Sequence, residues 1–298
     1  MNQAQPPQTI LITGCSSGFG EVAAKTLALA GHRVFATMRD VSGHNTEAGA
    51  RLHLWGERQN LRLEVVEMDV ANDASVQAAV EAIEAAGAQI DVVVNNAGIA
   101  AMGPIEAFDI GQMQDLYNVN VFGPLRVDKA VLPGMRGRRS GLLIHVSSTL
   151  GRILPGRGGL YPASKWAVEG LAESLAYEVG PFGIDLVILE PGAFPTTATA
   201  RGLRAANGTI AQEYAAASPR RAQAPSEDPD RQLPDLQDVG DEIRRLIELP
   251  QGQRPLRAVV GPIFTEGIAE YNQEYERVRD HLREVLKRPD QAVTWVRA

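Results

Sequence analysis

Cysteine is almost absent from this sequence of 298 residues, in which Cys15 is the single one. An intrachain disulfide and a cysteine-ligated metal cluster are therefore excluded. The histidines are not spaced as metal ligands, and we expect no metal site. Aromatic residues make up only 5%, and the formal net charge is −7. A nucleic-acid-binding protein presents a basic face with rings that stack on bases, so the composition argues against such partners.

Long apolar runs are also lacking, since no segment approaches the roughly 18 apolar residues that span a bilayer. Residues 1–8 are polar and contain proline, unlike the basic and then apolar start of a signal peptide. We therefore expect a cytoplasmic protein with no membrane partner. Hydrophobic residues at 44% and charged residues at 22% are typical of globular proteins. A chain of this length can bury a sizeable core without disulfides.

Short apolar runs alternate with stretches that carry apolar residues at helical spacing. The expected strands are residues 9–13, 33–37, 63–68, 91–95, 142–147, 185–190 and 257–261, and the expected helices are 21–30, 73–86, 108–132 and 161–179. Continuously apolar strands in such alternation predict a parallel sheet covered on both faces. We therefore predict one α/β domain over residues 1–298, with a doubly wound (Rossmann) sheet of about seven strands.

Two segments differ from this alternation. Residues 196–236 are rich in Ala, Arg, Pro and Asp with weak periodicity, and we interpret them as a helical, partly mobile insert beside the substrate. An extension over residues 262–298 contains a predicted amphipathic helix at 266–287. Neither segment is a repeat or a second domain.

The first predicted strand ends in a glycine-rich turn, Thr13-Gly14-Cys15-Ser16-Ser17-Gly18-Phe19-Gly20. Glycines let a backbone turn tightly and approach a pyrophosphate, which the N–H groups and dipole of the following helix then hold. The spacing is not the common Gly-x-Gly-x-x-Gly, so an ordinary strand-to-helix turn is the alternative. Its place after the first strand favours nucleotide binding.

This turn resembles the cofactor loop of the short-chain dehydrogenase/reductase family. Further motifs follow in the family's order: Asn95-Asn96-Ala97-Gly98 after the fourth strand, Tyr161-x-x-x-Lys165 at the start of a helix, and Pro191-Gly192 after the sixth strand. The resemblance covers residues 9–197, and the last third of the chain matches only in outline.

Tyr161 and Lys165 lie four residues apart and so share one helical face. A phenol with an ordinary pKa of about 10 needs a nearby positive charge to act as an acid or base near neutral pH. Lys165 supplies such a charge, and we expect it to lower the pKa of Tyr161. The alternative is an ordinary surface pair.

Ser148, at the end of a strand, is placed to donate to a substrate carbonyl. Ser147 is its rival, and the resemblance favours the second serine of the pair. Asn120 lies inside the predicted helix 108–132, where asparagine competes for backbone hydrogen bonds. The resemblance implies that Asn120 holds a water that connects Lys165 to solvent, and Asn118 is the competing residue.

The resemblance also implies a set of cofactor-binding residues. Asp69 and Val70 follow the third strand, where the family binds adenine, although a turn aspartate is the plain alternative. Asn95 to Gly98 would, by the resemblance, brace the central sheet and line the adenosine-ribose side, and a simple turn after a strand is also consistent there. After Pro191-Gly192, either Thr196 or Thr197 orders the nicotinamide carboxamide. The full predicted set is Gly14, Ser16, Ser17, Gly18, Phe19, Gly20, Arg39, Asp69, Val70, Asn96, Ala97, Gly98, Tyr161, Lys165, Pro191, Gly192 and Thr196.

The end of the second strand distinguishes NAD from NADP. NAD-binding folds place a carboxylate there, which repels a 2′-phosphate. This chain has Met38 followed by Arg39, whose guanidinium suits a phosphate. The sequence is similar to the NADP(H)-using 17β-hydroxysteroid dehydrogenase-like branch of the family. In the alternative, Asp40 accepts the ribose hydroxyls and the cofactor is NAD(H).

The predicted function is that of an NADP(H)-dependent oxidoreductase, of carbonyl reductase type, that interconverts an alcohol and a carbonyl. Apolar walls at residues 99–104, 150–159 and Phe194 indicate a lipophilic ketone, aldehyde or hydroxysteroid-like substrate. Two alternatives are an NAD(H)-dependent alcohol dehydrogenase of the same family and a non-catalytic nucleotide sensor on the same fold. The resemblance implies a homodimer or homotetramer joined through the helices at 108–132 and 161–179.

Overall fold

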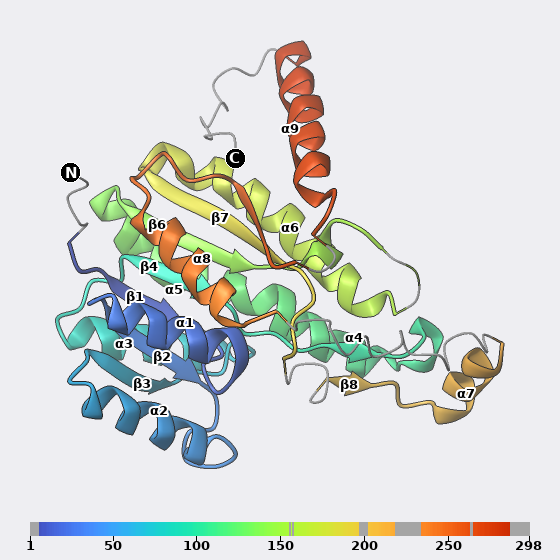
Figure 1. Ribbon diagram of the computed structural model, residues 1–298, viewed down its shortest axis with the longest axis horizontal. Coiled ribbons are helices and arrows are strands. Elements are labelled where there is room, and N and C mark those ends of the chain that lie inside the picture. Colours follow the sequence, from blue (N-terminus) through green and yellow to red (C-terminus); the bar gives the residue numbers. More distant parts are fainter. Residues whose placement is uncertain are drawn as a thin grey trace.

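The computed structural model describes residues 6–154, 156, 158–196, 202–217, 234–262 and 265–286. Seven parallel strands form one sheet in the order β3-β2-β1-β4-β6-β7-β9. Their bounds are β1 Thr9–Ile12, β2 Arg33–Met38, β3 Leu63–Glu67, β4 Val92–Asn95, β6 Gly141–Val146, β7 Ile184–Pro191 and β9 Arg257–Val260. All seven predicted strands are present within one or two residues, so the doubly wound sheet is confirmed (Figure 1).

Helices cover both faces of the sheet. On one face α1 (Gly18–Leu29), α2 (Thr46–Arg58) and α8 (Gln237–Glu248) pack against side chains such as Ile10 and Ile12. On the other face α3 (Asp73–Ala85), α5 (Gly123–Arg138) and α6 (Leu160–Val179) pack around Leu11 and Val93. Alternate strand residues thus enter opposite cores, as the period of two in a strand requires.

The predicted helix 108–132 is several elements instead of one. A 3-10 turn, η1 (Ile105–Ala107), precedes α4 (Ile110–Tyr117). Asp109 caps the start of α4, and its side chain and that of Gln112 form a reciprocal capping box. A π-helical segment, η2 (Asn118–Phe122), then joins α4 to α5. Such π-segments concentrate at functional sites, and this one contains Asn120.

Two helices, α2 and α8, were not expected. The sheet side of α2 consists largely of Gly49, Leu52 and Gly56, so the helix has almost no apolar stripe in its sequence. A methyl group added at Gly56 would lie 3.2 Å from Leu63 Cβ, and the helix therefore packs on the sheet through its backbone. In contrast, α8 buries Val239, Ile243, Leu246 and Ile247 at ordinary helical spacing.

The predicted insert at 196–236 is described only in part. Within it, β8 (Leu203–Arg204) pairs with β5 (Ala101–Met102), and α7 (Gly208–Ala216) follows at the far end of the molecule from the N-terminus (Figure 1). Two further 3-10 turns are η3 (Thr149–Gly151) and η4 (Gly180–Phe182). The helix predicted at 266–287 is α9 (Ile268–Val285), which stands out from the body of the molecule (Figure 1).

The strand order determines where the functional loops meet. β1 lies between β2 and β4, so the connections from β1 and β4 run to opposite faces of the sheet. Doubly wound sheets bind ligands at the carboxyl ends of the strands at this point. The glycine-rich turn after β1 and the turn after β4 both lie there.

Candidate active site

The glycine-rich turn is built so that side chains do not fit. Gly14 has φ +73° and Gly18 has φ +62°, which is left-handed backbone that favours glycine. A methyl group added at Gly14 would lie 2.8 Å from the Cα of Ala97, and one added at Gly20 would collide with the carbonyl oxygen of Gly14. The backbone thus turns sharply into α1, whose first N–H groups have no intrahelical acceptors.

Thr13 fixes this turn to the one after β4, a role that sequence reasoning missed. Its Oγ1 accepts hydrogen bonds from the backbone N–H groups of Asn96 (3.0 Å) and Ala97 (2.9 Å). In return, Asn96 Nδ2 donates to the carbonyl oxygens of Thr13 (2.8 Å) and Gly14 (3.2 Å). The side chain of Asn96, predicted to contact cofactor, therefore holds the shape of the turn.

A second brace lies beneath this turn in the core. Asn95 Nδ2 donates to Asp128 Oδ1 at 2.7 Å, and His145 Nε2 lies 2.9 Å from Asp128 Oδ2. These three side chains, all buried, connect β4, α5 and β6. Their mutual bonding explains why a histidine and an aspartate tolerate the interior.

Tyr161, Lys165 and Ser148 come together at the start of α6. Tyr161 and Lys165 lie one turn apart, and Lys165 Nζ is 5.8 Å from the centre of the Tyr161 ring. A hydrogen bond joins the Tyr161 hydroxyl to Ser148. Ser147, the rival serine, has a buried hydroxyl with no partner among the described residues. The serine beside the tyrosine is therefore Ser148.

Burial dominates the electrostatics of this pair. It raises the pKa of Tyr161 to about 12, and only the hydrogen bond with Ser148 acts in the opposite direction. Burial likewise lowers the pKa of Lys165 to about 8, although the charge of Glu169 counteracts it. Desolvation of the phenolate thus determines the pKa of Tyr161 in this structure, and Lys165 is not among its causes, so a lowering of this pKa by Lys165 stays a prediction. At neutral pH both groups carry their protons.

Lys165 Nζ donates to the carbonyl oxygen of Val146 at 2.8 Å. Asn120 lies close by, since a methyl group added at Gly98 would be 3.5 Å from Asn120 Oδ1 and 3.7 Å from Lys165 Nζ. The Asn120 side chain accepts from Ile99 N (2.9 Å) and donates to Ile99 O (2.9 Å). It also donates to Ser164 Oγ at 3.0 Å. Both donor positions of its amide are thus taken, while Oδ1 has one further acceptor position.

Asn118, the competing residue, lies apart from this group. Its Nδ2 donates to the carbonyl oxygen of Ala71 at 3.4 Å, and its Oδ1 accepts from Arg126 at 2.7 Å. The structure therefore places Asn120, and not Asn118, beside Lys165.

Arg39 is exposed at the carboxyl end of β2, and its guanidinium has no ion pair or hydrogen bond within the described part of the chain. The neighbouring Asp40 has φ +53°, and its carboxylate accepts from the N–H of His44 at 2.7 Å. Glu67 accepts from the N–H groups of Asp40 (2.6 Å) and Val41 (2.7 Å). The Asp40 carboxylate thus bonds within its own turn, whereas the Arg39 guanidinium is free to bind a ligand.

The other predicted contacts lie around the same edge of the sheet. Asp69 Oδ1 accepts from Ala71 N at 2.9 Å, which is the turn role that we gave as the alternative. Val70 packs against Gly123, since a methyl group added at Gly123 would lie 3.0 Å from Val70 Cγ2.

After Pro191, the N–H of Gly192 donates to Val260 O at 2.9 Å. Phe194 then meets Phe19 of the glycine-rich turn edge to face, with ring centres 5.2 Å apart. Thr196 N donates to Phe194 O at 2.9 Å, whereas Thr197 lies outside the described residues.

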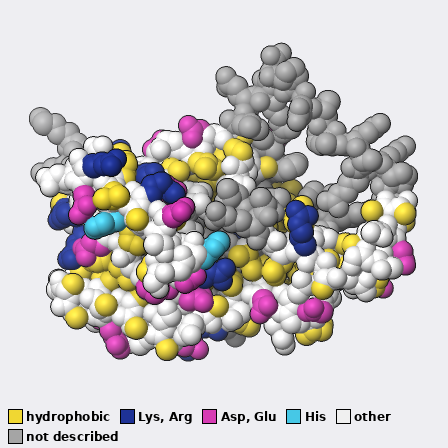
Figure 2. Space-filling view, turned by 90° about the horizontal axis from the view of Figure 1, so that it is seen from below, with side chains coloured by type: hydrophobic (Ala, Val, Ile, Leu, Met, Phe, Trp, Pro, Cys, Tyr) yellow, Lys and Arg dark blue, Asp and Glu magenta, His cyan; other side chains and the backbone are white. Residues whose placement is uncertain are grey.

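Among the described residues, none of the helices has the length and apolar character of a membrane span. The same residues contain no group of three or more His, Cys, Asp or Glu that could hold a metal ion. Cys15 is buried, and burial raises the pKa of its thiol. On the face drawn in Figure 2, basic and acidic side chains are interspersed among hydrophobic ones.

Comparisons with known proteins agree with this geometry. Retinol dehydrogenase 8 of Homo sapiens is 41% identical over 197 residues, which is 65% of this chain and 61% of that protein. A 3-ketodihydrosphingosine reductase of Bacteroides thetaiotaomicron is 40% identical over 191 residues, 64% of this chain and 65% of that one. The matched region spans about three fifths of the length of these relatives.

Among solved structures, a short-chain dehydrogenase from Streptomyces avermitilis is 31% identical with a TM-score of 0.72, and the match covers 95% of this chain and 97% of that one. A gluconate 5-dehydrogenase from Burkholderia cenocepacia, in complex with NADP and tartrate, is 31% identical with a TM-score of 0.61 over 66% of this chain and 75% of that one. The sequence model of the short chain dehydrogenase family matches residues 8–207. This chain therefore belongs to the short-chain dehydrogenase family.

Proposed function

We propose that the protein is an NADP(H)-dependent oxidoreductase that interconverts an alcohol and a carbonyl. The observation that carries this proposal is the cluster at the start of α6: a phenol hydrogen-bonded to Ser148, with an ammonium group 5.8 Å from its ring. The cluster lies at the carboxyl end of the sheet, where the glycine-rich turn also lies.

The residues present fit a dinucleotide. Gly14 and Gly20 let the turn pack closely on Ala97 and on its own backbone, whereas a methyl group at Gly18 would meet nothing within 4 Å, and α1 begins at this open position with free N–H groups. Gly14 to Gly20, Asp69, Val70 and Asn96 to Gly98 would hold the adenosine and pyrophosphate, and Lys165 and Pro191 to Thr196 the nicotinamide end. When bound, the nicotinamide ring supplies or accepts the hydride, and the protein orients the reactants.

Proton transfer falls to this chain's own groups. Tyr161 is protonated at neutral pH, which is the state needed to donate to the oxygen of a carbonyl. Ser148 polarises that oxygen by a second hydrogen bond. Lys165 binds the nicotinamide ribose and favours the phenolate once the proton has left. Asn120 holds the relay that returns a proton to Lys165.

Arg39 is the reason for proposing NADP(H) over NAD(H). Its guanidinium is exposed and unpartnered within the described chain, and a phosphate is the ligand that such a group favours. Asp40, the residue that would favour the ribose hydroxyls of NAD, already accepts from His44.

We further propose a lipophilic ketone, aldehyde or hydroxysteroid-like substrate. Leu150 and Phe194 are half-buried, and Leu154 is exposed, so apolar surface surrounds the carboxyl end of the sheet. The names of the relatives, a retinol dehydrogenase and a 3-ketodihydrosphingosine reductase among them, agree with this class.

We also propose that the protein forms a homo-oligomer. Phe122, Trp166 and Leu171 lie exposed on η2 and α6, the region predicted to pair two copies into a homodimer or homotetramer. Sedimentation measures this directly. A cytoplasmic location stays a prediction, which fractionation of cells tests.

The test of the function measures NADPH consumption at 340 nm with a panel of aldehydes and ketones. Tyr161→Phe removes the proton donor but keeps the ring, so we expect turnover to fall at least ~100-fold. NADPH affinity, measured by fluorescence, should stay within about twofold, because Lys165 and the glycine-rich turn are unchanged. Full activity of this variant, or no turnover of any carbonyl by the wild type, would refute the proposal.

A further inference from the structure

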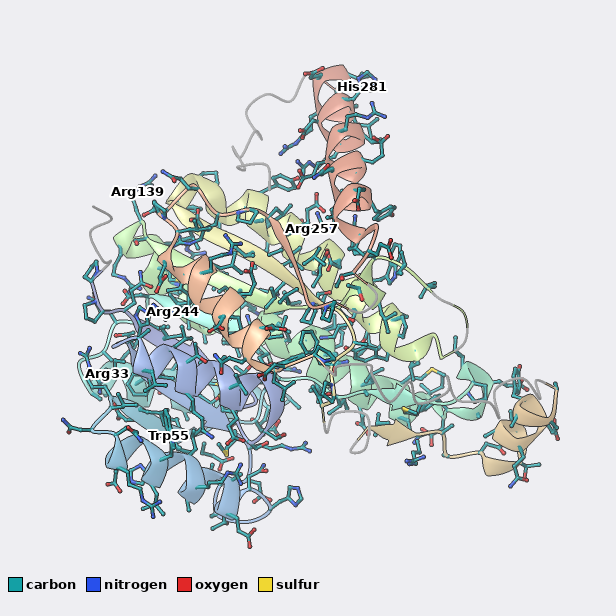
Figure 3. The ribbon with its side chains drawn as sticks, in the orientation of Figure 1. Arg33, Trp55, Arg139, Arg244, Arg257 and His281 are labelled. Carbon is teal, nitrogen blue, oxygen red and sulfur yellow. The ribbon has the colours of Figure 1, made fainter. Side chains whose placement is uncertain are left out.

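A cluster of buried charges lies between α6, β7, β9 and the base of α9, outside the site described so far. At its centre Arg257 Nε lies 3.0 Å from Glu169 Oε2 and 3.4 Å from Glu190 Oε1, and Arg257 Nη2 lies 2.7 Å from Glu173 Oε2. Figure 3 labels Arg257 where α9 joins the body of the molecule. All of these side chains are buried, so their positions are tightly coupled.

One neutral side chain of α9, Asn272, bridges Glu190 of this cluster to Arg152, whose Nε also lies 3.8 Å from Glu190 Oε1. Its Oδ1 accepts from Arg152 Nε at 2.8 Å, and its Nδ2 donates to Glu190 Oε2 at 2.6 Å. Asn272 is only 6% exposed. An amide has one acceptor and one donor end, and it can therefore satisfy a guanidinium and a carboxylate at once.

Both partners of Asn272 belong to segments that carry proposed active-site residues. Arg152 directly follows the turn η3, which Ser148 begins. Glu190 directly precedes Pro191 and Gly192, the segment proposed to hold the nicotinamide. Asn272 thus joins the loop of the proposed catalytic serine to the loop after β7.

The same cluster borders α6 near Lys165. A methyl group added at Gly151 would lie 3.1 Å from Glu169 Cγ and 3.3 Å from the carbonyl oxygen of Lys165. Because η3 packs this closely on α6, a shift of Arg152 moves the serine loop against the helix that carries Tyr161 and Lys165.

Aromatic residues of α9 stack on the same charges. The Arg152 guanidinium lies 4.9 Å from the ring centre of Tyr271 and 4.6 Å from that of Tyr275. Arg283, nearer the end of α9, lies 4.3 Å from the ring of Tyr177 on α6. These contacts dock a helix that lies wholly beyond the residues matched by the family model, 8–207.

We propose that Asn272 is a positioning residue: it sets the distance between the Ser148 loop and the Pro191 segment, and so couples α9 to turnover. The proposal rests on the function proposed above. Asn272 touches neither substrate nor reacting atoms, and it acts through Arg152 and Glu190. The glycine-rich turn has its own hydrogen bonds, through Thr13 and Asn96.

The first test compares Asn272→Ala with Gln273→Ala, which removes an exposed amide from the same helix. We expect kcat of Asn272→Ala to fall ~10-fold or more, since small misplacements of reacting groups have effects up to ~100-fold. The Kd for NADPH should stay within about twofold, because the glycine-rich turn does most of the binding. Gln273→Ala should retain wild-type values. A kcat of Asn272→Ala within about twofold of the wild type, or an equal loss in both variants, would overturn the proposal.

The second test uses Asn272→Asp, which keeps the acceptor for Arg152 but places a carboxylate against Glu190. The second carboxylate raises the pKa of Glu190 further above its value of about 8, and a proton shared between the two carboxylates restores the missing hydrogen bond, so the ratio of kcat to that of the wild type should rise as pH falls from about 10 to 8. The other charges that face this position, Arg257 and Glu169, are the same in both proteins. A ratio that does not change with pH contradicts the proposal. If Asn272→Ala does not fold, the result for Asn272→Asp is sufficient to test the proposal.

Hydrogen exchange separates the failure of this inference from the failure of the proposed function. If the wild type turns over no carbonyl, the proposed function is refuted. Exchange of the backbone amides still reports on how firmly Asn272 holds the two loops. Asn272→Ala should then exchange faster at residues 148–154 and 190–192, with residues 13–20 unchanged. Equal protection in both proteins counts against Asn272 as a positioning residue.

Discussion

Arg39 shows how a single exposed side chain distinguishes two cofactors. It lies at the carboxyl end of β2 with no partner in the described part of the chain, while Asp40 accepts from His44. A free guanidinium beside an engaged carboxylate attracts a phosphate more than a pair of hydroxyls.

Replacement of this arginine should therefore change cofactor preference. For Arg39→Ala we expect kcat/KM with NADPH to fall by roughly 10- to 100-fold, in line with the loss of a charge-assisted hydrogen bond. Values with NADH should change little. Arg58→Ala is the control, since Arg58 is also exposed but is the last residue of α2. Steady-state kinetics with both cofactors measure the difference, and an equal loss with NADH would assign Arg39 a structural role.

The role of Thr13 could not be predicted from the sequence. The spacing of the glycines around it predicts a tight turn, because a side chain does not fit at those positions. The two hydrogen bonds that its hydroxyl accepts come from residues more than 80 positions away. Only the neighbouring positions of β1 and β4 in the sheet bring these groups together.

At the scale of elements, the π-helical segment η2 places Asn120 beside Gly98 and Lys165. The side chain of Asn120 bonds both backbone groups of Ile99 as well as Ser164. It thereby fixes the loop after β4 to the start of α6. A regular helix through this segment would rotate Asn120 away from these partners.

Asn120→Ala should disturb this connection. It leaves the buried partners of the amide unsatisfied, which costs about 1–3 kcal/mol for such a group. Turnover should fall by about tenfold or more as the Lys165 environment loosens. Asn118→Ala is the matched control, because it removes hydrogen bonds of similar number on the same segment but far from Lys165. Chemical unfolding and kinetics of the two variants provide the comparison. Equal turnover in the two variants would show that the position of Asn120 has no special role.

Other elements show why sequence patterns detect some helices and not others. The apolar stripe of α8, formed by Val239, Ile243, Leu246 and Ile247, is plain in the sequence. The α2 helix has no such stripe, because Gly49 and Gly56 bring its backbone onto the sheet. The break between α4 and α5 carries one signal, Gly123-Pro124, because proline is favoured in the first turn of a helix and disfavoured in its interior.

At the scale of the whole molecule, the buried charge cluster affects the dependence of stability on pH. Burial, reinforced by the charge of Glu169, raises the pKa of Glu190 to about 8. In the unfolded chain this carboxyl titrates near its ordinary value of 4.5. Between these values the folded protein holds a proton that the unfolded chain has released, so this group's contribution to stability is lost as pH rises.

Glu190→Gln should remove this dependence while it keeps an acceptor for Asn272. Compared with the variant, the wild type should lose free energy of unfolding on the order of 1 kcal/mol per pH unit between pH ~5 and ~8. Urea unfolding at several pH values measures the difference. Glu274→Gln, which changes an exposed carboxylate of α9, is the control. Parallel pH profiles for the wild type and Glu190→Gln would contradict the prediction.

The burial of Cys15 has a practical consequence. As the single thiol of the chain it is 1% exposed, in the core beneath the glycine-rich turn. A cysteine introduced on the surface would thus be the only one that a maleimide dye or spin label reaches readily. One label on the outer turn of α9, at His281 (Figure 3), would follow by spectroscopy how firmly that helix stays attached during turnover.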